Sequence, residues 1–224
     1  MVADCHTRFE NHPLVEGNAR QTAFKYLEKL LKYTISTTIR RLRICCKVWP
    51  TEELMRIPAI FKVSYWSVQM YPLMCDAFLN FVCKTSQVKH LHLNADETSR
   101  IDMILPSRFF DSNFFKQLEH ADLNVNAVVS DGAFLSSRAK FLRLQCDTIS
   151  ETAINQKVRQ WCEAQIDSEL QISLEANRRM NVDVIRQNLP FANGWFEWNK
   201  IQRNDGKIGT LYVQNSLLSF NASH

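Results

Sequence analysis

The chain has 224 residues, of which 46% are hydrophobic, and its 27 Lys or Arg against 23 Asp or Glu give a formal net charge of +4. With only 5 Gly and 6 Pro, this composition excludes collagen-like, linker-like and low-complexity chains and supplies enough apolar side chains to bury a core. No apolar run reaches the about 18 residues needed to cross a bilayer. Residues 1–8 lack the basic and then apolar order of a signal peptide, so we expect a protein of the cytoplasm or nucleus without membrane contact.

Six short stretches in which apolar and polar residues alternate predict β-strands. In chain order they are residues 38–44, 61–65, 88–93, 121–125, 141–145 and 170–174. Each contains a pair of apolar residues that we expect in the core: Leu42 and Ile44, Val63 and Tyr65, Leu91 and Leu93, Leu123 and Val125, Leu142 and Leu144, Leu170 and Ile172. Helical stretches with one apolar face lie at 23–31, 73–82 and 154–162, and we expect surface loops at 96–100 and 129–132. The third helix has two candidate N-caps, Thr148 in a capping box and Ser150.

The order of these elements predicts an α/β fold. Successive strand cores start roughly 20 to 30 residues apart, near the about 20–29 residues of a leucine-rich repeat. Because helical returns between strands favour parallel pairing, we expect a leucine-rich-repeat-like solenoid with a mainly parallel sheet and helices on one side. Asn204-Asp-Gly206 predicts a tight turn between 195–203 and 207–213, and this antiparallel hairpin, with a short strand near 217–220, is expected to close the solenoid. We expect residues 1–19 as an N-terminal extension and 20–224 as one domain.

No stretch of the sequence predicts a catalytic, metal or cofactor site. The seven cysteines contain no C-x-x-C pair, so we expect free thiols, with Cys75, Cys83, Cys146 and Cys162 in apolar surroundings. His90 and His92 have a spacing that can chelate zinc or copper, but no third ligand lies nearby in the sequence, which favours two polar residues on an exposed strand face. The vicinal Cys45 and Cys46 lack any local base or G-x-S-x-G motif, and the few glycines form no nucleotide-binding loop.

The residues that alternate with the buried leucines form a polar ladder along one face of the sheet. Because solenoid proteins use their extended face for recognition, we expect this ladder to bind another macromolecule. Its candidate protein-binding residues are Arg41, Arg43, His90, His92, Asn124, Arg143, Gln145 and Gln171. Ser64, Asp122 and Ser173 belong to the same ladder. Basic clusters around Arg40, Arg138 and Arg178 leave nucleic-acid binding as an alternative, although the nearly balanced charge favours solvated surfaces, and a cysteine-dependent enzyme is a third reading.

A further set of motifs lies within residues 121–213. Phe134 to Ile149 leads into a helix with Asn155, Val158 and Trp161, then comes Glu169-Leu-Gln-Ile172, and Arg203-Asn-Asp-Gly206 closes the segment. Together they resemble the type-2 F-box-associated domain of nematode proteins. This resemblance implies a non-enzymatic substrate-recognition module related to adaptors of cullin-type ubiquitin ligases, where an F-box docks to a Skp1-like subunit. His12-Pro13-Leu14-Val15 does not continue into an F-box pattern, so we expect the recognition half alone, an unknown protein as substrate, and a Skp1-like partner only as an open alternative.

Overall fold

The computed structural model describes residues 25–26, 28–29, 38–45, 62–70, 88–95, 103–167, 169–191 and 199–223. Contacts between Cα atoms divide the chain into two compact units, Met1–Met103 and Ile104–His224. Several expectations lie outside the described residues: the extension 1–19, the apolar helical positions within 23–31, the helix 73–82, the loop 96–100, and residues 195–198 of the predicted hairpin.

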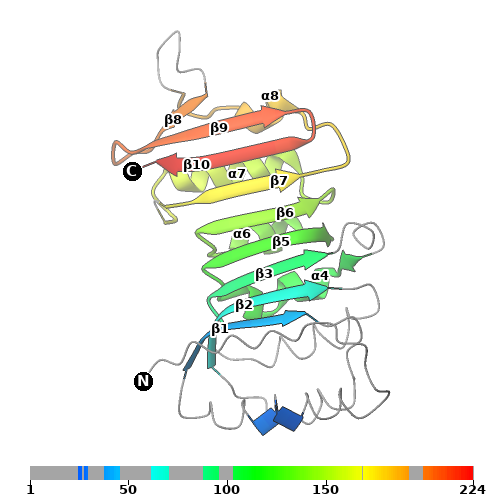
Figure 1. Cartoon of the computed structure of the whole chain (residues 1–224). Helices are drawn as coiled ribbons and strands as arrows, with labels where there is room; N and C mark the ends of the chain where they lie inside the picture. Colours follow the sequence, from blue (N-terminus) through cyan, green and yellow to red (C-terminus); the bar gives the residue numbers. More distant parts are fainter. Residues whose placement is uncertain are drawn as a thin grey trace. The chain divides into compact units, whose positions relative to one another are not determined.

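The first unit contains three parallel strands in the order β1-β2-β3. Their bounds are β1 Thr38–Cys45, β2 Lys62–Met70 and β3 His90–Ala95 (Figure 1). Trp66 and Val68 are buried and lie in register with Leu91 and Leu93, as the alternation of these strands requires. The predicted core pair in β2 is therefore wrong at Tyr65, which is half-buried and pairs with His90 instead. The five-residue pattern used for that prediction missed the rest of the strand, where Trp66 and Val68 fix which side chains are buried.

The second unit combines parallel and antiparallel strands. The strand order is β5-β6-β7-β10-β9-β8, with β4 beside β5. Pairing is parallel from β4 to β7 and antiparallel from β7 through β10 and β9 to β8. The bounds are β4 Ile104–Leu105, β5 His120–Ala127, β6 Phe141–Cys146, β7 Gln171–Glu175, β8 Lys200–Gln202, β9 Ile208–Gln214 and β10 Leu217–Ser223.

All six predicted strands are present, and the α/β class with a mostly parallel sheet is confirmed. The predicted tight turn also forms, because Gly206 adopts a φ of 87° between β8 and β9, a region that favours glycine. The sheet is not closed by this hairpin. Instead β10 pairs with β7, so the C-terminal strands extend the sheet of the second unit.

The helices of the second unit are mostly short: α4 Ser107–Asp111, α5 Asn113–Lys116, α6 Asp131–Ser136, α7 Glu151–Cys162 and α8 Val182–Arg186. The expected loop at 129–132 is wrong from Asp131 onward, because the Ser130 side chain accepts a hydrogen bond from Ala133 N and starts α6. The Ser150 side chain likewise accepts a hydrogen bond from Ala153 N and starts α7. Ser150 is therefore the N-cap, and the predicted capping box that starts at Thr148 is wrong. Thr148 instead bonds both backbone polar groups of Val129.

The longest of these helices, α7, packs on the strands through its apolar side. Figure 1 shows α6 and α7 behind the strands of this unit. Trp161 of α7 is fully buried and meets Phe220 of β10 edge to face, with ring centroids 5.0 Å apart. Gly209 of β9 lies against this pair, and a Cβ there would come within 2.8 Å of Phe220 Cζ, so a larger residue would force the aromatic rings to shift. Within the described part of the chain, no helix has the length and apolar character of a membrane span.

Candidate interaction face

In the strands of the second unit, buried side chains alternate with side chains that are half-buried or exposed. The second set forms a surface that we call the open face. Along β5, β6 and β7 every second residue is buried, and the residues between them are half-buried or exposed. The same alternation continues in β10 and in most of β9. The open face comprises His120, Asp122, Asn124, Asn126, Phe141, Arg143, Gln145, Gln171, Ser173, Glu175, Thr210, Tyr212, Gln214, Leu217, Ser219 and Asn221.

The middle of the open face is a row of side chains in register across five strands. The row runs through Asp122, Arg143, Ser173, Ser219 and Tyr212. Arg143 Nη1 lies 3.4 Å from Asp122 Oδ1, and the Arg143 side chain is 52% exposed. Such an exposed pair contributes little to stability. The guanidinium is nevertheless exposed enough for a group of a partner molecule to reach it.

Aromatic side chains flank this row at the start of the parallel strands. His120 and Phe141 are half-buried cross-strand partners whose rings stack with centroids 4.1 Å apart and an interplanar angle of 5°. The Arg143 guanidinium carbon lies 5.8 Å from the Phe141 ring centroid, within cation–π range. These contacts hold Arg143 between a carboxylate and a ring, which limits its rotamers.

Two large side chains are exposed on the antiparallel strands of the open face. Leu217 is 49% exposed and Tyr212 is 42% exposed, and the Tyr212 hydroxyl donates a hydrogen bond to Gln214. On the parallel strands nearby, Gln145 Nε2 donates to Glu175 Oε2 at 2.8 Å. Tyrosine and arginine are two of the residue types enriched at the centre of protein–protein interfaces.

The sequence-predicted site residues fall into two groups. Arg143, Gln145, Gln171 and Asn124 all lie on the open face, and Asn124 lies where the register between β5 and β6 shifts. Tyr212 and Leu217 of the open face were not predicted, because the C-terminal hairpin was expected to close the solenoid and not to extend the sheet. The alternation along β9 and β10 is the signal that could have found them.

The other predicted site residues belong to the first unit. Arg41 and Arg43 are exposed, whereas His90 and His92 are half-buried. Arg41 is in register with Tyr65 and His90, and Arg43 with Ser67 and His92, so all four predicted residues share one face of β1–β3. In the described part of the chain, three or more His, Cys, Asp or Glu side chains nowhere gather as a metal site would require.

The described cysteines have the environment expected for core residues. Cys146 and Cys162 are buried free thiols, and the Cys146 sulfur lies 3.2 Å from Thr148 Oγ1. Burial raises the pKa of Cys162 to about 11. Its thiol therefore stays protonated near neutral pH, which makes it a poor nucleophile.

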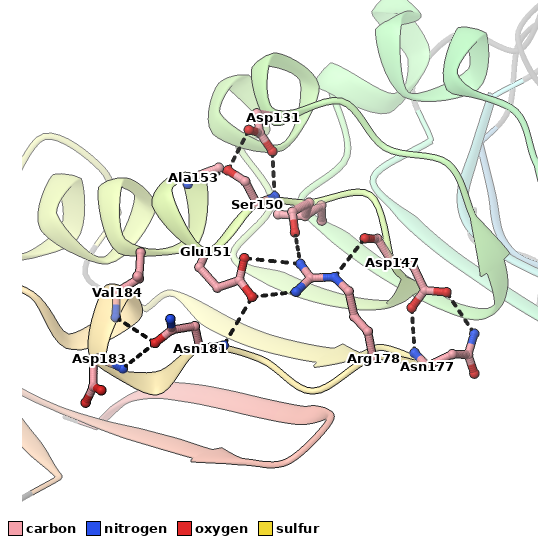
Figure 2. A network of polar contacts seen from close by, with 11 residues as sticks. Asp131, Asp147, Ser150, Glu151, Ala153, Asn177, Arg178, Asn181, Asp183 and Val184 are labelled. Carbon is pink, nitrogen blue, oxygen red and sulfur yellow. Dashed lines mark hydrogen bonds and ion pairs between the residues drawn. The ribbon is translucent and has the colours of Figure 1, made fainter.

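A polar network lies at the carboxyl ends of β6 and β7, where many α/β proteins bind ligands (Figure 2). Its centre is Arg178, whose Nε donates to Asp147 O at 3.1 Å and whose Nη2 donates to Ile149 O at 2.8 Å. Nη1 forms an ion pair with the Glu151 carboxylate, which also accepts from Asn181 N at 3.1 Å. All three guanidinium nitrogens thus donate within the chain, and we assign this network to holding the loops after β6 and β7 together.

Replacing Arg178 by methionine is expected to lower the free energy of unfolding at pH 7 by about 2 kcal/mol, because it leaves a largely covered carboxylate and two carbonyls without their donor. The difference should shrink in acid. The Arg178 guanidinium holds the pKa of Glu151 below its ordinary 4.5, so the pair stabilises the fold above that pH and loses its effect as pH falls through the lowered pKa. Urea unfolding at several pH values measures this, with exposed Arg179→Met as control. A pH-independent difference would contradict the assignment.

Comparisons with known proteins add no family assignment. No protein-family model matches the chain. Neither a curated protein nor a solved structure shows significant similarity to it.

Proposed function

We propose that this chain is a non-enzymatic protein-binding module of the cytoplasm or nucleus that recognises its partner with the open face. The observation that supports the proposal most is the row across the open face in which Arg143 of β6 and Tyr212 of β9 are both exposed. Binding energy at protein interfaces is concentrated in a few tyrosine, tryptophan and arginine side chains, surrounded by groups that mainly exclude water. The serine, asparagine and glutamine side chains of the open face suit that second role.

We further propose that β5, β6, β7 and their helices are turns of a short leucine-rich-like solenoid. Contacts between successive connections support this. Ser150, at the start of α7, bonds the Asp131 carboxylate of α6 through its hydroxyl at 2.6 Å and its backbone N at 2.8 Å. One connection later, Asp147 accepts hydrogen bonds from the backbone and the side chain of Asn177. Stacked, mutually bonded turns of this kind leave one face of the strands available for recognition.

A relation to substrate-recognition subunits of cullin-type ubiquitin ligases also remains a proposal, and it rests on the sequence resemblance. Several of the residues that carry the resemblance make contacts between elements of the second unit. Asn155 Nδ2 donates to Ile185 O and Gln187 O, both at 2.8 Å. Arg203 lies 5.6 Å from the Trp161 ring and donates to Asp205 at 3.1 Å. These contacts tie α7 to α8 and to the final hairpin.

Charge reversal on the open face tests the proposed function. The tagged full-length chain would be used to isolate partners from the native organism, in parallel with Arg143→Glu and Tyr212→Ala. The matched control is Arg159→Glu on α7, since Arg159 is 50% exposed and pairs with Glu163 at the same 3.4 Å as Arg143 with Asp122. We expect at least about tenfold less partner with Arg143→Glu, because a reversed charge meets the partner's complementary group.

The comparison decides between specific outcomes. Partner yield that falls with Arg143→Glu and Tyr212→Ala, but not with Arg159→Glu, supports the open face, provided that the unfolding midpoints agree. Equal yield from all four proteins would overturn it. A Skp1-like or cullin subunit among the recovered proteins would support the relation to ubiquitin ligases.

A further inference from the structure

The strands of the first unit carry charge of one sign. Residues 38–45, 62–70 and 88–95 contain five Lys or Arg and no Asp or Glu. Of these cations, Arg41 and Arg43 are exposed on the face that also carries Tyr65 and His90, whereas Arg40 and Lys89 alternate with the residues of that face. A surface of one sign attracts and orients a partner of the opposite sign.

Arg41 is held in a defined position on this surface. Its guanidinium carbon lies 4.7 Å from the ring centroid of Tyr65, its cross-strand partner. On the next strand, His90 follows in register, with its ring centroid 6.3 Å from that of Tyr65. Stacking uses the flat face of a guanidinium, whereas its N–H donors point outward in the plane of the group. Arg41 can therefore bind a carboxylate through two hydrogen bonds while it remains stacked on Tyr65.

Arg43 supplies a second cation at a fixed distance. It lies two residues further along β1, it is exposed, and its own row contains Ser67 and His92. Alternate residues of a strand lie about 6.7 Å apart and point to the same side. Alternate residues of an extended partner segment have the same spacing. Two acidic side chains separated by one residue can therefore pair with Arg41 and Arg43 at the same time.

We propose that this face of β1–β3 binds an extended acidic protein segment that has carboxylates at alternate positions. A protein segment fits better than single-stranded nucleic acid, which depends on exposed ring faces for base stacking. Tyr65 is half-buried and carries Arg41 against its ring, so it offers no such platform. This face is formed by β1–β3, whereas the open face is formed by strands of the second unit. The acidic-segment proposal can therefore fail while the proposed function holds, and the reverse.

Two peptides of one composition test the proposal on the full chain. Each has four glutamates and eight threonines, with the glutamates at every second position in one peptide and at every third in the other. We expect the alternating peptide to bind at least about tenfold more tightly to the wild type than to Arg41→Gln/Arg43→Gln, with affinity falling as salt rises. The control of equal charge is Arg159→Gln/Arg179→Gln, which removes two exposed arginines of the second unit and should bind like the wild type. Tyr65→Phe should keep the affinity, whereas Tyr65→Leu should lower it several-fold at an unchanged unfolding midpoint.

Three results would overturn the proposal. The first is equal binding of the two peptides, which would show that the spacing of Arg41 and Arg43 is irrelevant. The second is equal loss of binding in both double variants, which would show a response to net charge alone. The third is tighter binding of oligouridine RNA than of the alternating peptide, with the same dependence on Arg41 and Arg43, which would assign the surface to nucleic acid.

Discussion

Replacing Trp161 by alanine is expected to lower the free energy of unfolding by about 3–5 kcal/mol, the usual cost of removing a buried indole. Trp161 is fully buried at the place where α7 meets the antiparallel strands. Its ring contacts Phe220 on one side, and the Arg203 guanidinium lies 5.6 Å from it. Arg203 in turn donates to Ile166 O at 2.9 Å. Loss of the indole therefore leaves a cavity and frees the arginine that fixes the final hairpin.

Urea unfolding followed by circular dichroism measures this effect. Trp161→Phe keeps an aromatic contact with Phe220 and should lose roughly half as much. Gly209→Ala provides an independent check, because its new methyl group would press on Phe220 and Trp161 from β9 and should cost about 1–3 kcal/mol. A loss below about 1 kcal/mol for Trp161→Ala would show that α7 does not pack on β9 and β10 as described.

Between pH 8 and pH 10.5, the wild type is expected to gain up to about 3 kcal/mol of stability relative to Lys157→Met. Lys157 on α7 is buried, and its Nζ donates to Leu135 O at 3.0 Å and to Ser137 O at 2.7 Å at the end of α6. Burial lowers the pKa of Lys157 from 10.5 to about 8. A neutral amine still has two hydrogens for the two carbonyls and no longer carries the cost of a buried charge. Since the unfolded chain then binds more protons than the folded one, stability rises with pH over this interval.

The comparison with Lys157→Met isolates this group from others that titrate nearby. Cys162 acts in the opposite direction, because burial raises its pKa from 9.0 to about 11 and its contribution to stability is lost in alkali. Both proteins contain Cys162, so its effect cancels in their difference. Lys140→Met serves as a second control, because the pKa of Lys140 is raised by its bonds to Glu169 and Asp167. Parallel stability profiles of the wild type and Lys157→Met from pH 7 to pH 10.5 would contradict the buried position of Lys157.

Much of the strand layout could be predicted from alternation alone. Leu91 and Leu93, or Leu142 and Leu144, are separated by polar residues, and a strand with one buried face explains that pattern. The same pattern placed Arg143 and Gln145 on the exposed side. It failed at Tyr65, where an apolar side chain lies among polar neighbours and stacks on Arg41.

The remaining features depend on contacts that no local pattern reveals. Helices α4, α5 and α6 span only four to six residues, which is too short for a helical period to appear. The pairing of β10 with β7 joins strands that are distant in the sequence, so Tyr212 and Leu217 were not expected on the recognition surface. Lys157 lies within an otherwise apolar helical stripe. Its burial depends on the carbonyl group of Ser137 at the end of α6, which accepts a hydrogen bond from Lys157 Nζ.

On the proposed function, a protein partner contacts the open face and not the side covered by helices. The most direct measurement places a photoreactive amino acid at position 212 of β9 or at position 159 of α7, and illuminates each protein in an extract of its native organism. We predict a discrete cross-linked protein from position 212 that is missing with the Arg143→Glu change and is not formed from position 159. Cross-links formed from position 159, with none from position 212, would contradict the account.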